Sequence, residues 1–235
     1  ILTFIFLSIS LLTKSQNCTT LGQTPNTAFP VCGETIFRQT EVPICSNTTL
    51  YVPGCPADIN NSYKDTNPFW YKFTCFQSGT LGFRIDPNNQ GNDDYDWQLY
   101  DITGLPPDAV FTNRNIIISG NWAGTYAPTG ASATGVSGIE CASAPQDNRP
   151  TFARMPNILI GHEYLLLVSH FTQTQSGYSL SFTGGTAVIT DPKLPKLVSA
   201  TAPCDGQKII VVMNKKMKCR SVAANGSDFR INIAG

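Results

Sequence analysis

The residues with the clearest chemical potential are oxygen-bearing side chains in one short stretch of the chain. They lie between positions 86 and 96: Asp86, Asn88, Asp93, Asp94 and Asp96. Calcium takes about six to eight oxygen ligands, and loops rich in Asp, Asn and Gly often provide them. The stretch begins like an EF-hand loop, although Trp97 stands where that loop carries a glutamate. It therefore predicts a structural calcium ion and no other cofactor. The alternative is an ordinary loop whose Asp and Asn residues serve turn geometry.

Two aromatic residues in a stretch rich in small residues are candidates for ligand binding. Trp122 and Tyr126 lie within the sequence Asn-Trp-Ala-Gly-Thr-Tyr. Facing outward, the two rings would form a platform on which a sugar could stack. The alternative is that they anchor a long loop against its own domain.

Catalytic residues are not predicted anywhere in this chain. His162 and His170 are its two histidines, and no acidic constellation frames them in the sequence. The closest approach to a nucleophile elbow, Gly135-Val-Ser-Gly138, lacks the second glycine spacing. Asp94 and Asp96 would project from one face of a strand, too close together for the two carboxyls of a glycosidase. We therefore expect no enzyme activity within the chain.

Eight cysteines indicate a disulfide framework rather than a metal cluster. They are Cys18, Cys32, Cys45, Cys55, Cys75, Cys141, Cys204 and Cys219, and none forms a C-x-x-C pair. The sequence does not determine their connectivity. The pairs we expect are Cys18–Cys32, Cys45–Cys55 and Cys75–Cys141. Cys204 and Cys219 pair either with each other or with a cysteine outside the chain.

The first residues resemble a secretory signal. An apolar run over residues 1–12 is too short for a stable membrane anchor, and small residues at Thr13 and Ser15 suit cleavage before Gln16. We interpret residues 1–15 as a signal peptide that lacks its own beginning. The sequence thus predicts a secreted protein, handled by an export machinery and without a transmembrane anchor.

The amino-acid composition indicates the fold class and which kinds of partner to expect. Hydrophobic residues make up 41% of the chain and charged residues 14%, with a formal net charge of zero. No basic stripe is visible, so a nucleic-acid partner is not expected. Abundant turn-forming residues and the lack of long helix-forming stretches indicate an all-β protein.

Alternating hydrophobic patterns predict five strands, at residues 69–75, 80–86, 95–101, 163–170 and 178–183. We expect the first two to form an antiparallel hairpin. The nearly continuous apolar run at 163–170 suits a central strand. Residues 121–150 carry few large apolar side chains, which predicts an excursion over the surface.

These patterns divide the chain into successive parts. Residues 16–65 form a loop-rich segment containing cysteines, and residues 66–190 form a disulfide-stapled antiparallel β-sandwich of jelly-roll type. Residues 191–196 are a linker. Three further strand candidates follow, at 197–200, 208–213 and 228–233, and three strands do not close a sandwich. We therefore expect residues 197–235 to be the start of an incomplete domain.

Several of these motifs resemble a known class of surface protein. They are Phe69-Trp-Tyr-Lys-Phe-Thr, Leu81-Gly-Phe-Arg-Ile, Asp93-Asp-Tyr-Asp-Trp-Gln-Leu-Tyr-Asp101 and Gly177-Tyr-Ser-Leu-Ser-Phe182. Together they resemble the β-sandwich of large surface proteins of gliding bacteria, which are exported by the type IX system. They are also similar to bacterial pre-peptidase C-terminal domains. The tail from Ala202 to Met217, with Gly226 to Phe229, resembles the start of a bacterial immunoglobulin-like domain.

The resemblance implies a non-catalytic, gliding-motility-associated module at the bacterial cell surface. Its role would be structural or adhesive, within a larger secreted protein, and its partners would be surface glycans or proteins. The alternative is a carbohydrate- or protein-binding accessory domain of a secreted hydrolase.

Overall fold

The computed structural model of the chain describes residues 18–32, 36–42, 44–45, 48–56, 63–172, 174–203, 208–215 and 227. The chain divides into two compact units, Ile1–Thr190 and Asp191–Gly235. The predicted signal peptide, Cys204, Cys219 and the strand expected at 228–233 lie outside the described residues.

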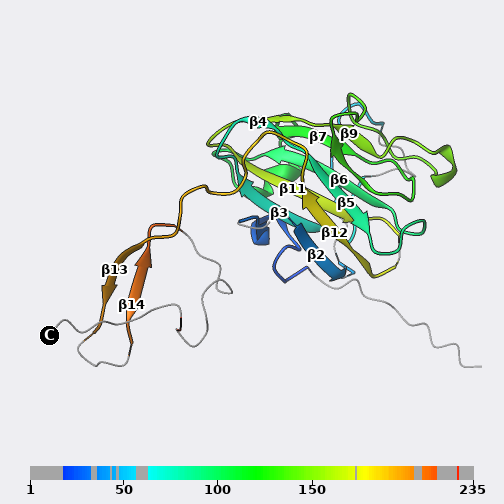
Figure 1. Ribbon diagram of the computed structural model, residues 1–235. Helices are drawn as coiled ribbons and strands as arrows, with labels where there is room; N and C mark the ends of the chain where they lie inside the picture. Colours follow the sequence, from blue (N-terminus) through cyan, green and yellow to red (C-terminus); the bar gives the residue numbers. More distant parts are fainter. Residues whose placement is uncertain are drawn as a thin grey trace, which may run out of the picture. The chain divides into compact units, whose positions relative to one another are not determined.

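The first unit contains two five-stranded sheets (Figure 1). The first sheet has the order β1 (Phe29–Pro30), β3 (Phe69–Thr74), β11 (Glu163–His170), β6 (Tyr95–Asp101) and β7 (Ile117–Asn121). The second has the order β2 (Ile36–Glu41), β12 (Ser176–Phe182), β5 (Phe83–Pro87), β8 (Thr129–Ser132) and β9 (Phe152–Arg154). Neighbouring strands are antiparallel except β1–β3 and β8–β9. The predicted all-β sandwich is confirmed.

Helical structure in the described residues is limited to 3₁₀ turns. They are η1 (Pro25–Thr27), η2 (Pro107–Phe111), η3 (Arg114–Ile116) and η4 (Pro145–Asp147). In this part of the chain, no helix has the length and apolar character needed to cross a membrane.

An aromatic core fills the space between the two sheets. Phe83 of the second sheet packs edge-on against Trp97 of the first, with ring centroids 4.7 Å apart. The hydroxyls of Tyr71 and Tyr178 also connect the sheets, at 2.9 Å. Alternation along β6 places Tyr95, Trp97 and Leu99 in this core, as the sequence predicts.

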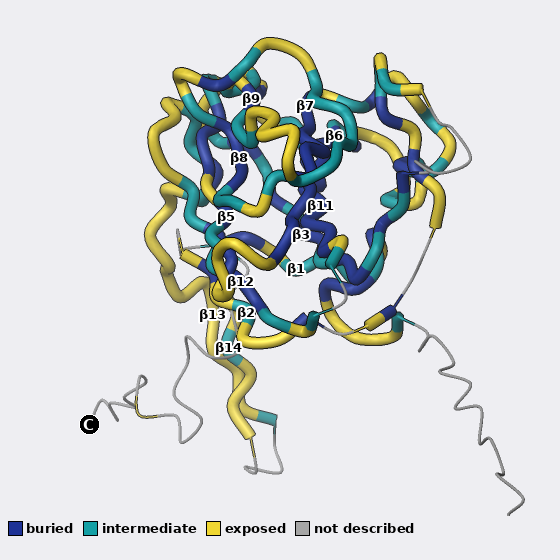
Figure 2. Tube along the Cα trace, turned by 90° about the vertical axis from the view of Figure 1, so that its right-hand side faces the viewer, coloured by how far each residue is buried: buried dark blue, intermediate teal, exposed yellow. Residues whose placement is uncertain are grey.

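The outer face of the first sheet is buried as well, beneath a second apolar cluster that we call the cover. Its members from the sheet are Trp70, Tyr100, Leu165 and Leu167. Its members from the connecting segments are Leu50, Val52, Tyr63, Val110, Ile116 and Trp122. Burial on both faces explains why β11 is continuously apolar. The buried stretches of the trace run through these central strands (Figure 2).

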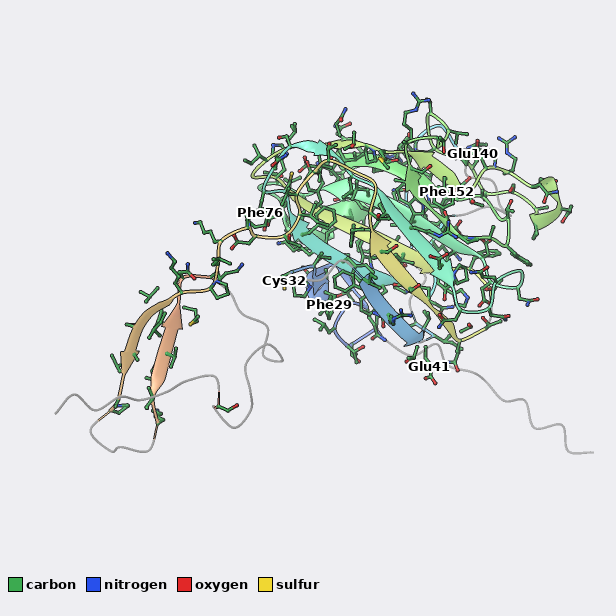
Figure 3. The ribbon with its side chains drawn as sticks, in the orientation of Figure 1. Phe29, Cys32, Glu41, Phe76, Glu140 and Phe152 are labelled. Atoms are coloured by element: carbon green, nitrogen blue, oxygen red, sulfur yellow. A yellow bond between two sulfur atoms is a disulfide. The ribbon has the colours of Figure 1, made fainter. Side chains whose placement is uncertain are left out.

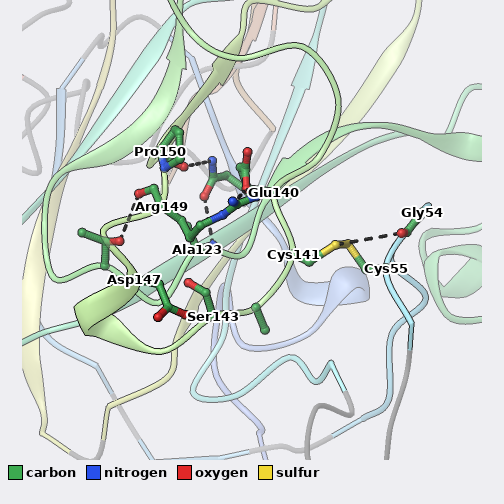
Figure 4. A network of polar contacts seen from close by, with 12 residues as sticks. Gly54, Cys55, Ala123, Glu140, Cys141, Ser143, Asp147, Arg149 and Pro150 are labelled. Atoms are coloured by element: carbon green, nitrogen blue, oxygen red, sulfur yellow. Dashed lines mark hydrogen bonds and ion pairs between the residues drawn. A yellow bond between two sulfur atoms is a disulfide. The ribbon is translucent and has the colours of Figure 1, made fainter.

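The described residues contain two disulfides, and all three expected pairings are wrong. Cys18 bonds to Cys45. Cys55 bonds to Cys141, as Figure 4 shows. Cys75 is buried with a free thiol, and Cys32 is also free (Figure 3). The second disulfide joins a loop of the cover to the stretch 121–150. Sequence proximity misled the expected pairings, because the fold brings segments 86 positions apart together.

Two further expectations about the strands are wrong. β3 and β5 do not form a hairpin, because they belong to opposite sheets. Between them, β4 (Gly79–Thr80) pairs with β10 (Asn157–Ile158). The stretch 121–150 is not purely superficial either, since β8 pairs with β5. Glycine is required at position 130, because any Cβ there would collide with the Phe83 carbonyl oxygen.

The second unit contains an antiparallel pair, β13 (Leu197–Thr201) and β14 (Ile210–Met213). All described side chains of β13 are exposed, and those of β14 are exposed or half-buried. Lys215 contacts the carboxylate of Asp191 at 3.5 Å within the same unit.

Candidate functional site

The five residues predicted to bind calcium do not converge on one place. Asp86 alternates with the core residue Ile85, so it faces the outside of the second sheet, where it pairs with Arg84 at 2.7 Å. The side chain of Asn88 donates to the carbonyl of Gln39. Of the remaining three residues, Asp96 lies in β6 of the first sheet and Asp93 and Asp94 directly precede that strand, on two different faces.

Asp94 and Asp96, which we call the acidic pair, lie on the outer face of the first sheet. Tyr95 and Trp97 point into the core between the sheets, so the alternating positions 94 and 96 point the other way. Asp94 is 4% exposed and Asp96 is 5% exposed. Oδ1 of each carboxylate is buried and accepts no hydrogen bond from the described residues.

Ionising the acidic pair costs free energy, because both carboxyl groups are buried. Burial raises the pKa of Asp94 to about 7. Burial, together with the nearby charge of Asp94, raises the pKa of Asp96 well above its usual range. Among the described residues, Lys and Arg make their ion pairs with Glu163, Asp86, Glu140 and Asp191. The pair is therefore buried without a compensating protein cation in that part of the chain.

Oxygen atoms of the stretch 121–150 approach the acidic pair around Gly124. A Cβ at Gly124 would lie 3.6 Å from Oδ2 of Asp94 and would collide with the Ser143 carbonyl oxygen. The Gly124 amide donates to the Ser143 hydroxyl at 3.2 Å. Ser143 follows the disulfide-bonded Cys141 closely in the chain (Figure 4).

Hydrogen bonds hold the chain around Ser143 in place. The carboxylate of Asp147 accepts from the Ala144 amide at 3.1 Å, and Arg149 pairs with Glu140 at 2.7 Å. The Asn121 side chain donates to the Pro150 carbonyl at 3.0 Å. The oxygens near Asp94 are thus carried by a segment fixed at both ends.

Asp93 belongs to a separate buried cluster on the inner face of the first sheet. His170 Nε2 lies 3.8 Å from Asp93 Oδ1 and 2.8 Å from the Thr172 hydroxyl. The His170 ring stacks on Tyr95 at 4.4 Å, and Thr174 donates to Asp93 at 2.6 Å. Burial lowers the pKa of His170, although the Asp93 charge opposes the shift. The imidazole is fully buried, so it has no contact with solvent in this structure.

The second histidine also has an acidic partner that the sequence did not reveal. His162 Nδ1 lies 2.6 Å from Asp101 Oδ2, and the Thr103 hydroxyl donates to Asp101 Oδ1. Burial would raise the pKa of Asp101, but hydrogen bonds from Thr103 and His162 outweigh it and lower that pKa. Among the described residues, no hydroxyl or thiol hydrogen-bonds to the other ring nitrogen of His162. Asp101 therefore orients the imidazole, and the free Cys75 lies across from His162, its amide donating to the His162 carbonyl at 3.0 Å.

Trp122 does not face outward, and its surroundings match the alternative that it anchors a long loop. Trp122 is 4% exposed, packs edge-on against Tyr63 at 5.3 Å and donates to Gln98 Oε1 at 3.0 Å. Tyr126 is exposed. Trp122 thus anchors its segment to the cover, and the two rings do not form a platform together.

Comparison with known proteins assigns no relative. No family model, no curated protein and no solved structure matches this chain. Among the described residues, no three His, Cys, Asp or Glu side chains are grouped so that they could hold a metal ion. The two disulfides are consistent with an extracellular protein.

The raised pKa of Asp94 has a measurable effect on stability in metal-free buffer. Asp94 keeps its proton in the folded state up to about pH 7, whereas in an unfolded chain an aspartate loses it near pH 3.9. Folding is therefore penalised progressively between those two values. With EDTA present, we expect Asp94→Asn to match the wild type at pH 4 and to exceed it by on the order of 2 kcal/mol at pH 7.

Urea unfolding at several pH values, followed by tryptophan fluorescence, measures this difference. All three tryptophans lie in the first unit, so their signal reports that unit alone. Asp86→Asn is the matched control, and its difference from the wild type in free energy of unfolding should not increase with pH. A constant difference between Asp94→Asn and the wild type from pH 4 to pH 7 would contradict the prediction.

Proposed function

We propose that this chain is a non-catalytic extracellular module with a structural or adhesive role. The observation that carries the proposal is the double burial of the first sheet. Its inner face packs on the second sheet, and its outer face packs beneath the cover. The disulfide between Cys55 and Cys141 joins one loop of the cover to the stretch 121–150. Such a body is suited to bearing load and displaying loops.

The distribution of titratable groups supports this role. His170, Asp93 and the acidic pair are all withdrawn from solvent. The resemblance to surface proteins of gliding bacteria supports a place at the bacterial cell surface, reached through the type IX route. Surface glycans or proteins are the partners that this role implies.

Bead retention under flow tests the proposal. Beads carrying the oxidised chain should stay on glycan- or protein-coated surfaces at shear that removes beads carrying the reduced and alkylated chain. A panel of peptide, ester and glycoside substrates should show no turnover. Turnover that His162→Ala abolishes would overturn the proposal, because His162 is a partly exposed histidine with an oriented ring. Binding of soluble glycans without retention under load would favour an accessory domain instead.

A further inference from the structure

We propose that the acidic pair, Asp94 and Asp96, binds a calcium ion on the outer face of the first sheet. The site differs from the loop that the sequence predicts, because Asp86 and Asn88 take no part in it. The proposal stands independently of the structural or adhesive role.

The first argument is the pair of unpaired carboxylate oxygens on the outer face of the first sheet. Five buried side-chain atoms of the described residues have no hydrogen-bond partner, and two of them are Oδ1 of Asp94 and Oδ1 of Asp96. Buried polar groups are rarely left unpaired, and each exception calls for a water, an ion or another explanation. Oδ1 atoms of Asp94 and Asp96, projecting from the same face of one strand, point to a shared ion.

The second argument is charge. Two carboxylates buried beside each other repel, and each loses the solvation that it has in water. The ion pairs of the described residues leave both of them without a lysine or arginine. A divalent cation would balance the two negative charges with two positive ones.

The third argument is the supply of neutral oxygens on both sides of the pair. Ser169 of β11 lies directly opposite Asp96 in the sheet. On the other side, the Ser143 carbonyl and Asp94 Oδ2 both approach the position where Gly124 lacks a Cβ. Calcium accepts carboxylate, carbonyl and hydroxyl oxygens in irregular geometry, whereas magnesium demands a near-ideal octahedron. Two carboxylates with neutral oxygens from two segments therefore favour calcium.

An ion at this position would tie β6 to the stretch 121–150. Cys141 connects the same stretch to the cover through its disulfide. Calcium and the disulfide would then hold neighbouring points of one segment, and the ion would stiffen it rather than take part in chemistry.

Thermal unfolding of the oxidised chain at pH 7.5 tests the site, with EDTA, CaCl2 or MgCl2 added. Extracellular calcium modules bind with dissociation constants of about 0.1 to 1 mM, so about 10 mM CaCl2 is sufficient. We expect CaCl2 to raise the Tm of the wild type by about 5 °C. MgCl2 should produce a clearly smaller shift. Calorimetric titration with CaCl2 should give one site.

Three variants locate the ion. Asp94→Asn and Asp96→Asn keep the shape of each side chain but remove its charge, and each should abolish the calcium shift while remaining folded in EDTA. Asp86→Asn, in the loop that the sequence predicts, should keep the full shift. If either neutral variant does not fold, the other variant and the calorimetric titration of the wild type decide the matter.

Four results would overturn the proposal. They are the absence of any calcium shift in the wild type, an equal shift with MgCl2, a shift that Asp86→Asn removes, and a shift that survives in both Asp94→Asn and Asp96→Asn.

Discussion

Replacing Cys55 and Cys141 by serine is expected to lower the free energy of unfolding by about 4 to 5 kcal/mol. The bond closes a loop between residues 86 positions apart, so its loss frees a large amount of chain entropy in the unfolded state. It also joins a loop of the cover to the segment that carries Trp122. Urea unfolding followed by tryptophan fluorescence gives the free energy directly.

The other disulfide provides a matched comparison. Cys18 and Cys45 are 27 positions apart, so their replacement by serine should cost less, about 3 to 4 kcal/mol. Replacing the free Cys32 should have little effect, because its half-buried thiol forms no disulfide. A smaller loss for the Cys55–Cys141 variant than for the Cys18–Cys45 variant would contradict the proposed importance of the link.

Replacing Trp122 by alanine is the second large effect, with an expected loss of about 3 to 5 kcal/mol. The indole is almost completely buried and packs against Tyr63. Its removal also leaves Gln98 Oε1 without the donor that it has in the folded protein. Circular dichroism and urea unfolding of the variant measure the loss.

Two further variants separate packing from ligand binding. Trp122→Phe keeps an aromatic ring and should lose less stability, with the remaining deficit reflecting the unpaired Gln98 oxygen. Tyr126→Ala removes an exposed ring and should be close to neutral. If Trp122→Ala were as stable as the wild type, the assignment of Trp122 to the cover would be wrong.

Local patterns predicted five of the ten strands in the two large sheets, β3, β5, β6, β11 and β12, because alternation depends on neighbouring residues alone. Phe69–Thr74 has Tyr71 and Phe73 facing the core and Trp70 on the other face, as the pattern indicates. The continuous apolar run Glu163–His170 is indeed the central strand of its sheet. In both cases a side chain's direction follows from its position along the strand.

The candidate site was only partly predictable. The alternation around Tyr95 and Trp97 places Asp94 and Asp96 on one face, and the sequence identified both as possible ligands. Nothing local indicated that this face would be covered, or that Ser143 would approach it. The partners of the two histidines were also missed, since Asp93 and Asp101 are distant from them in the chain.

The sequence by itself determined the all-β class, the positions of the main strands and the presence of disulfides, because these follow from composition and short-range periodicity. Only the tertiary structure decided which cysteines bond, which strands share a sheet, and that Trp122 and the acidic pair are buried. These features depend on contacts between segments far apart in the chain. Such contacts are set by the packing of whole layers, since each apolar face must find a partner wherever the chain provides one.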